Sequence, residues 1–171
     1  AEQYVEMALQ YQRLAGKTGD LMLREYRLDK LVKQAVKRVA PLFIHKKLRV
    51  EINEISTTVV TDEKWLLFVL EQLLTNAVKY TNRGTISICY RDKLSQIADT
   101  GIGILPEDLP RVFEWGYTGF NGRSEKRSTG IGLTLCKQML KRLGHDIRLV
   151  STPGKGTTVF LYLDQTEFSI E

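Results

Sequence analysis

The most informative feature of this sequence is a row of polar residues on an otherwise apolar helix, in residues 71–80 (EQLLTNAVKY). Gln72, Asn76 and Lys79 follow one another at intervals of four and three residues, so a helix places them on one face. A core helix has little use for such a row, because buried polar groups need hydrogen-bonding partners. A half-exposed surface helix would tolerate it, whereas a helix that holds Mg²⁺ and phosphate oxygens would need it.

Three glycine-containing segments follow this helix. They are residues 99–104 (DTGIGI), 128–133 (STGIGL) and 154–159 (GKGTTV). A single G-x-G is a weak signal, because glycine is common in turns. The first segment directly follows a strand-like run, however, and the second opens an apolar helix. The order of all four segments along the chain is therefore the informative feature.

This order resembles the ATP-binding catalytic domain of sensor histidine kinases, which share a fold with gyrase, Hsp90 and MutL. In the terms of that family, the polar helix is the N box and the glycine segments are the G1, G2 and G3 boxes. Residues 110–114 (PRVFE) resemble the F box between G1 and G2. The resemblance covers about residues 28–163, and it implies a Bergerat-type fold that binds ATP and Mg²⁺.

Residues 107–119 and 121–123 narrow the resemblance to kinases of Gram-positive bacteria that partner peptide-antibiotic transporters. The resemblance then implies a cytoplasmic domain of a sensor kinase in a bacterial plasma membrane, without direct membrane contact of its own. The implied partners are the histidine-bearing dimerisation domain of the same kinase and a cognate response regulator. A transporter is a further candidate partner of the full-length protein.

Composition agrees with one ordinary globular domain. The 171 residues are 43% hydrophobic and 26% charged, and no apolar run approaches the roughly 20 residues that span a bilayer. The N-terminus shows no signal-peptide pattern, so any membrane part is expected outside these residues. The net charge of +5 would permit nucleic-acid binding, but the basic residues are scattered among acidic ones, so no nucleic-acid partner is expected.

Hydrophobic periodicity predicts an α+β two-layer sandwich, with helices on one face of a mixed, mostly antiparallel sheet. Helices are predicted at residues 28–40, 63–80 and 134–143, with a short one at 107–113. Strands are predicted at residues 48–52, 57–61, 85–90, 94–98, 146–150 and 157–163. Residues 1–26 are expected to be the tail of a helical dimerisation region plus a linker, and residues 27–171 the ATP-binding domain. The alternative for the N-terminal segment is a helix packed on the domain itself.

The predicted adenine site centres on Asp99, which ends a strand just before two glycines. The resemblance assigns its carboxylate to the exocyclic amine of adenine, while the alternative is a turn-forming aspartate. Gly101 and Gly103 would let the backbone approach the nucleotide, because they lack a Cβ. The resemblance also places the hydroxyl of Thr157 near adenine, although a plain strand residue is the alternative.

The predicted phosphate site uses the polar helix. By resemblance, Asn76 supplies an amide oxygen to Mg²⁺, an ion that takes oxygen ligands and relies on substrate phosphates. Lys79 would act as a point charge on the phosphates, and Tyr80 would pack near the base or ribose unless it serves the core. The resemblance adds further nucleotide contacts: Ile104, Phe113, Arg123, Lys126, Thr129, Gly130, Ile131, Gly132 and Leu133. The glycines among them open a helix, whose backbone N–H groups suit phosphate oxygens.

Gln72, grouped with Asn76 and Lys79 as catalytic, departs from the asparagine usual in the family. ATP-hydrolysing relatives carry a water-activating Glu at the matching position. Here Glu71 is one residue away, about 100° around the helix, and glutamine cannot act as a base. This departure disfavours a gyrase-like or Hsp90-like ATPase.

Neither histidine has the setting of a phosphoacceptor, which lies on a long helix and is followed by an acidic residue. His45 is followed by two lysines, and His145 follows a glycine at a helix-to-strand turn. Cys89 and Cys136 share no CxxC spacing, so buried free thiols are expected rather than a metal site.

The resulting hypothesis is a catalytic domain that transfers the γ-phosphoryl of Mg-ATP to a histidine on a separate helical domain. A serine kinase of the anti-sigma type and a nucleotide-dependent interaction module are the alternatives.

Overall fold

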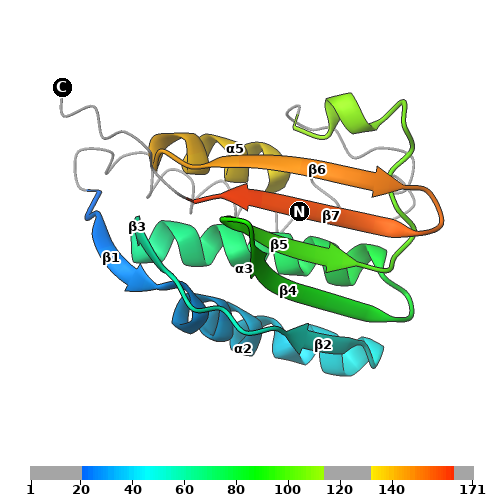
Figure 1. The fold of residues 1–171 in the computed structure, drawn as a ribbon. Helices are drawn as coiled ribbons and strands as arrows, with labels where there is room; N and C mark the ends of the chain where they lie inside the picture. The colour runs from blue at the N-terminus through cyan, green and yellow to red at the C-terminus, as the bar shows by residue number, and fades with distance from the viewer. Residues whose placement is uncertain (1–20, 114–131, 164–171) are drawn as a thin grey trace, which may run out of the picture.

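A computed structural model describes residues 21–113 and 132–163. In these ranges three helices lie behind a five-stranded sheet, and a second sheet has two strands (Figure 1). The helices are α2 (Leu28–Lys46), α3 (Glu63–Tyr80) and α5 (Gly132–Arg142). The main sheet runs in the order β2 (Arg49–Ile52), β4 (Thr85–Arg91), β5 (Leu94–Asp99), β7 (Gly156–Tyr162) and β6 (Asp146–Thr152). The second sheet pairs β1 (Arg24–Arg27) with β3 (Thr58–Thr61).

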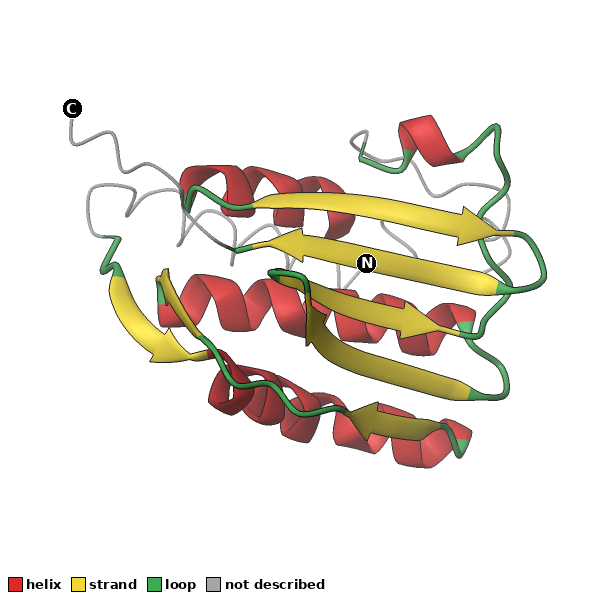
Figure 2. Cartoon of the chain, viewed as in Figure 1, coloured by secondary structure: helices red, strands yellow, loops and turns green. Residues whose placement is uncertain are grey.

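The main sheet is mixed and mostly antiparallel. Only β2 and β4 pair in parallel, while the β4–β5, β5–β7 and β7–β6 pairs are antiparallel. All three helices cover the same face of this sheet (Figure 2). The predicted α+β two-layer sandwich is therefore confirmed. Across the described ranges, no helix combines the length and the apolar character that crossing a membrane requires.

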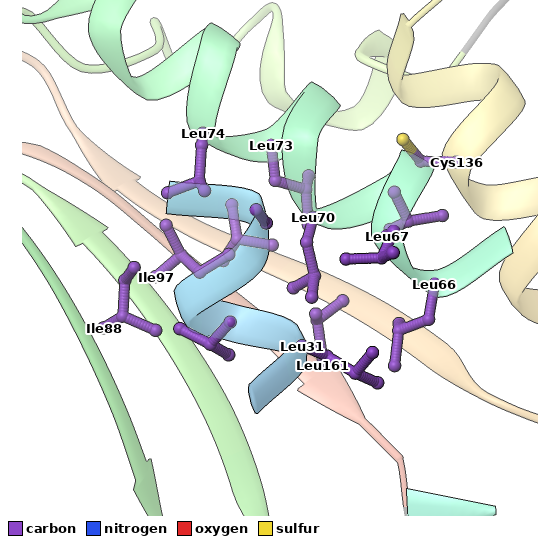
Figure 3. Close-up of a cluster of buried hydrophobic side chains, with 14 of the residues drawn as sticks. Leu31, Leu66, Leu67, Leu70, Leu73, Leu74, Ile88, Ile97, Cys136 and Leu161 are labelled. Atoms are coloured by element: carbon purple, nitrogen blue, oxygen red, sulfur yellow. The ribbon is translucent and has the colours of Figure 1, made fainter. Parts of the chain in front are cut away.

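The core lies between the helices and the inner face of the sheet (Figure 3). On β4, Ile86 and Ile88 are buried while the alternate residues Ser87 and Cys89 are only half-buried, as the two-residue period of a strand requires. The helix α3 contributes ten buried side chains, more than either neighbouring helix. This apolar burial holds α3 against the sheet and leaves its polar row on the other side.

The helix α2 extends beyond its predicted end. Pro41 lies inside it, and the helix continues to Lys46 before Lys47 closes it with a left-handed φ of 58°. Proline removes one backbone hydrogen bond, but the added turn buries Phe43, which is 4% exposed. Burial of a phenylalanine contributes about 1.5–3 kcal/mol, enough to offset much of the proline penalty.

The helix α3 has the predicted bounds. Asp62 caps its N-terminus by accepting a hydrogen bond from the backbone N–H of Trp65 at 3.1 Å. The second carboxylate oxygen of Asp62 accepts from the backbone N–H of Met22 at 3.0 Å. The segment before β1 is thus tied to the start of α3.

The strand predicted at residues 57–61 exists as β3, but it pairs with β1, outside the main sheet. β1 itself was not predicted as a strand. The remaining differences are small. Within the described residues α5 begins at Gly132, and β6 extends to Thr152. The short helix predicted at residues 107–113 is a 3-10 turn, η2 (Leu109–Arg111).

Candidate functional site

The polar row of α3 lies along the half-buried side of the helix. Gln72, Asn76, Lys79 and Tyr80 are each partly exposed, whereas the neighbouring Leu73, Leu74, Ala77 and Val78 are buried. The ammonium of Lys79 lies 5.4 Å from the centroid of the Tyr80 ring. The helix therefore presents an amide and a cation beside an aromatic ring, as its sequence predicted.

Asp99 lies at the end of β5, on the inner face of the sheet. Its Oδ1 accepts hydrogen bonds from the backbone N–H of Gly101 at 2.9 Å and of Thr157 at 3.2 Å. Among the described residues, no donor reaches its Oδ2. Burial raises the pKa of this carboxyl group above its ordinary value, and the two backbone hydrogen bonds only partly oppose that rise. The site thus holds a partly desolvated carboxylate with one oxygen available.

The G1 segment packs directly on the end of α3. The backbone N–H of Ile102 donates to the carbonyl of Tyr80 at 3.0 Å. A Cβ added at Gly101 would overlap that same carbonyl, and one added at Gly103 would overlap the carbonyl of Thr152. The backbone at both glycines therefore lies close to other backbone of the same chain. The predicted approach of these glycines to a nucleotide stays a prediction.

The β6–β7 hairpin joins the G1 and G3 segments through Ser151. Its hydroxyl oxygen lies 2.7 Å from the backbone nitrogen of Ile104, 3.1 Å from the carbonyl oxygen of Gly156 and 2.7 Å from the hydroxyl of Thr157. Sequence reasoning missed Ser151. A serine in a strand-like run carries no local signal, and its contacts come from residues 47 positions earlier and 6 positions later.

Lys46 is a second residue that sequence reasoning missed. From the last turn of α2, its ammonium donates to the backbone carbonyls of Val78 at 2.7 Å and Lys79 at 3.1 Å. These carbonyls end the helix that carries the polar row. In the sequence Lys46 lies beyond the predicted end of the helix at residue 40 and next to another lysine, so it carried no signal of this role.

Three predicted nucleotide contacts, Phe113, Gly132 and Leu133, directly flank residues 114–131. The ring of Phe113 packs against the core, with the ammonium of Lys137 4.6 Å from its centroid, and its carbonyl accepts from Thr134 at 2.7 Å. Leu133 also packs against the core, and Gly132 is the first described residue of α5. The structure therefore joins the F box to α5. Five other predicted contacts lie in residues 114–131, outside the described residues: Arg123, Lys126, Thr129, Gly130 and Ile131.

Glu71 does not share the environment of the polar row. Its carboxylate forms an ion pair with Arg38 of α2 at 3.2 Å, and its backbone carbonyl accepts from the hydroxyl of Thr75. Gln72 occupies the neighbouring position on the row. Within residues 21–113 and 132–163, no cluster of three His, Cys, Asp or Glu side chains could hold a metal ion.

His145 and the cysteines are structural. His145 is 5% exposed, its Nε2 lies 3.0 Å from the Thr61 hydroxyl, and burial lowers its pKa to about 4. Cys136 is buried in the core, which raises the pKa of its thiol, and Cys89 is half-buried. Both cysteines are free thiols, as expected, but only Cys136 is buried.

Comparison with known proteins assigns this chain to a family. Residues 61–167 match the family described as histidine kinase-, DNA gyrase B-, and HSP90-like ATPase. The chain is 36% identical over 162 residues to the sensor protein BceS of Halalkalibacterium halodurans, covering 92% of this chain and 48% of BceS. It is 35% identical to the sensor histidine kinase YxdK of Bacillus subtilis, covering 91% of this chain and 50% of YxdK. The chain thus spans about half the length of these relatives.

A solved structure shows the same fold. The full-length ShkA structure in complex with AMPPNP superposes with a TM-score of 0.73 at 22% identity, covering 90% of this chain and 33% of ShkA. The chain therefore belongs to the histidine kinase-, DNA gyrase B- and HSP90-like ATPase family, as an ATP-binding domain of the sensor histidine kinase type.

Proposed function

We propose that this domain binds Mg²⁺-ATP and presents the γ-phosphoryl group to a histidine on a separate helical domain of the same sensor kinase. The observation that carries the proposal is the setting of Asp99. Its carboxylate is partly desolvated, held through Oδ1 by two backbone N–H groups, and offers Oδ2 as an acceptor. It lies where the G1 and G3 segments meet.

Oδ2 of Asp99 is suited to the exocyclic amine of adenine. An ionised carboxylate can only accept hydrogen bonds, and the exocyclic amine of adenine acts as a hydrogen-bond donor. Desolvation makes an unpaired carboxylate costly, so a donor that fills the last position is favoured. Thr157, whose N–H already bonds Asp99, brings its hydroxyl to the same place.

The polar row of α3 would bind the phosphates. Asn76 offers one amide oxygen, which fits an ion that takes hard oxygen ligands and completes its shell with phosphates and water. The absence of a carboxylate cluster among the described residues agrees with such a sparse site. Bound Mg²⁺ would neutralise phosphate charge, and Lys79 would add a point charge beside it. Gln72 would be a neutral neighbour to this set.

In the proposed reaction, the bond between the γ-phosphorus and the bridging oxygen of ADP breaks, and a bond to an imidazole nitrogen of the acceptor forms. ADP leaves with the negative charge, and the acceptor nitrogen gives up any proton it carries. Positioning and charge neutralisation supply most of the catalysis in phosphoryl transfer. In this proposal Asp99 positions the nucleotide through its base, and Asn76 and Lys79 act at the phosphates.

The acceptor and partners follow from the same assignment. The acceptor would be the dimerisation domain, a response regulator would receive the phosphoryl group, and a transporter is a candidate partner of the whole kinase. The domain would lie on the cytoplasmic side of a bacterial plasma membrane. Burial of His145 and its bond to Thr61 argue against that histidine as the acceptor.

Calorimetry with ATP and Asp99→Asn tests the adenine assignment. An amide can turn a donor toward the donor of the base, so affinity should fall about 10- to 100-fold, as for a lost bond to a charged group. Because burial disfavours the charged carboxylate in the folded protein, Asp99→Asn should not lower the free energy of unfolding. Asp146→Asn, an exposed aspartate at the far end of β6, is the matched control and should bind normally.

A phosphotransfer assay with separate histidine and serine protein acceptors tests the reaction. Acid-labile label on the histidine acceptor alone is the expected result. Label on serine would favour the anti-sigma-type alternative. ATP binding without any transfer would favour an interaction module, and unchanged ATP affinity in Asp99→Asn would refute the adenine site.

A further inference from the structure

The hydrogen-bond inventory of Ser151 settles the direction of every bond at this hydroxyl. A serine hydroxyl has one proton to donate and two lone pairs that accept. The N–H of Ile104 can only donate, so it uses one lone pair. The carbonyl of Gly156 can only accept, so it takes the Ser151 proton. The remaining bond, 2.7 Å to Thr157, must then use the second lone pair of Ser151.

It follows that Thr157 donates its own hydroxyl proton to Ser151. A threonine hydroxyl has no second proton, so its remaining lone pairs can only accept. The same residue stands next to Asp99, because its backbone N–H bonds Oδ1 at 3.2 Å. Among the described residues, the side chains of Thr157 and Asp99 therefore both present acceptors at this place.

We propose that Ser151 is a positioning residue that sets base specificity by holding the Thr157 hydroxyl in its accepting orientation. The proposal rests on the proposed nucleotide site. A pair of acceptors suits a purine with an amino group at C6, whose two N–H bonds can be shared between them. A purine with a keto oxygen at C6, as in hypoxanthine or guanine, would place an acceptor against acceptors.

Removal of the Ser151 hydroxyl should weaken this discrimination. In Ser151→Ala the Thr157 hydroxyl loses its nearest acceptor and can rotate to donate to a keto oxygen. The N–H of Ile104 and the carbonyl of Gly156 also lose a partner, so overall affinity for both nucleotides should fall somewhat. The specific signature is the ratio of the two affinities, which a general loosening of the site would leave unchanged.

The experiment measures dissociation constants of ATP and of inosine triphosphate for the 171-residue chain by calorimetry. The wild-type protein should prefer ATP, and Ser151→Ala should lower that preference about 5- to 10-fold, the worth of one hydrogen bond. Ser95→Ala is the matched control, because Ser95 lies on β5, is 0% exposed and has no hydrogen-bond partner for its hydroxyl among the described residues. It should keep the wild-type ratio.

A double-mutant cycle tests whether Ser151 acts on base preference through the Thr157 hydroxyl or independently of it. Thr157→Val removes the Thr157 hydroxyl. In that background Ser151→Ala should not further change the ratio of the ATP and inosine triphosphate affinities. If Ser151→Ala does not fold, Ser151→Cys serves the same purpose, because a thiol is a weak acceptor for the Thr157 proton. It should also lower the ratio.

The possible outcomes are distinct. A wild-type protein that binds ATP selectively, with Ser151→Ala or Ser151→Cys at the same ratio, would overturn the role of Ser151 and leave the proposed function standing. An equal effect of Ser151→Ala with and without the Thr157 hydroxyl would also overturn it. A wild-type protein that binds neither nucleotide, or both equally, would overturn the proposed adenine site and this inference together.

Discussion

Lys46 and Val78 are joined by a 2.7 Å hydrogen bond from the lysine ammonium to the backbone carbonyl, which fastens α2 to the end of α3. The last carbonyls of a helix have no partners within the helix, and a cation near them also complements the helix dipole. Lys46 supplies such a donor to the carbonyl of Lys79 as well. The end of α3 that carries Lys79 and Tyr80 is thus held by a neighbouring helix.

Lys46→Met should lower the free energy of unfolding by about 1.5–3 kcal/mol, because two carbonyls lose a charged donor. Urea unfolding measures it. Lys37→Met, an exposed lysine of the same helix, is the matched control and should stay within about 0.5 kcal/mol of the wild-type value. Equal stabilities of the two variants would show that the bond contributes nothing.

Gly101→Ala should weaken both the fold and ATP binding. The added Cβ would overlap the carbonyl of Tyr80, so either the G1 segment or the end of α3 must move, at about 1–3 kcal/mol. Gly154→Ala is the comparison, because its Cβ would meet no atom within 4 Å and only its φ of +78° is unfavourable. That variant should lose about 1–2 kcal/mol of stability, and its loss of ATP affinity should be smaller than that of Gly101→Ala. Unchanged affinity in Gly101→Ala would argue against the proposed site.

Glu71→Gln should leave ATP affinity unchanged. In a steady-state assay, its rate of phosphate release should be no lower than that of the wild-type protein. Its carboxylate bonds Arg38 on α2, and such a partly exposed ion pair is worth about 0.2–1 kcal/mol. Arg38→Met should have a similarly small effect on stability, and the double variant should show their coupling. A large loss of phosphate release in Glu71→Gln alone would instead indicate a water-activating base and favour the ATPase interpretation.

Asn76→Ala should remove the contribution of Mg²⁺ to ATP affinity. Comparing affinities in Mg²⁺ and in a chelator isolates that contribution, because contacts with the base are common to both conditions. Asn82→Ala, an exposed asparagine just beyond α3, is the control and should keep the wild-type difference. The ligand role of Asn76 is wrong if its variant still gains as much affinity from Mg²⁺ as the wild-type protein does.

His145 should make the fold sensitive to mild acid. Burial lowers its pKa to about 4 in the folded protein, whereas the unfolded chain takes up a proton near the ordinary value of 6.5. Proton uptake by the unfolded state then lowers the free energy of unfolding as the pH falls from 6.5 to 4, and contributes nothing above 6.5. At about 1.4 kcal/mol per pH unit, the loss approaches about 3 kcal/mol.

Urea unfolding between pH 4 and 7.5 measures this loss. His145→Gln can still bond Thr61 but does not titrate, so its stability should fall less over that range. His45→Gln, at an exposed position of α2, should follow the wild-type curve. Parallel curves for wild type and His145→Gln would assign the acid sensitivity to other groups.

The helix that carries Asn76 and Lys79 could be predicted from the sequence, because the period of its apolar residues is a local signal. The main strands and the layered fold class could be predicted as well, since alternating burial follows from strand geometry. The glycine segments could also be located from the sequence, because their order and spacing are visible along the chain.

Which groups meet at the site could not be predicted from the sequence, because it depends on contacts between distant segments. β3 pairs with β1 rather than with the main sheet, and α2 continues past Pro41 because Phe43 finds a place in the core. Ser151 and Lys46 became site residues only when partners distant in sequence came within hydrogen-bonding distance. Hydrogen bonds are directional and short, so they depend on the final packing of whole elements, which no local pattern of residues encodes.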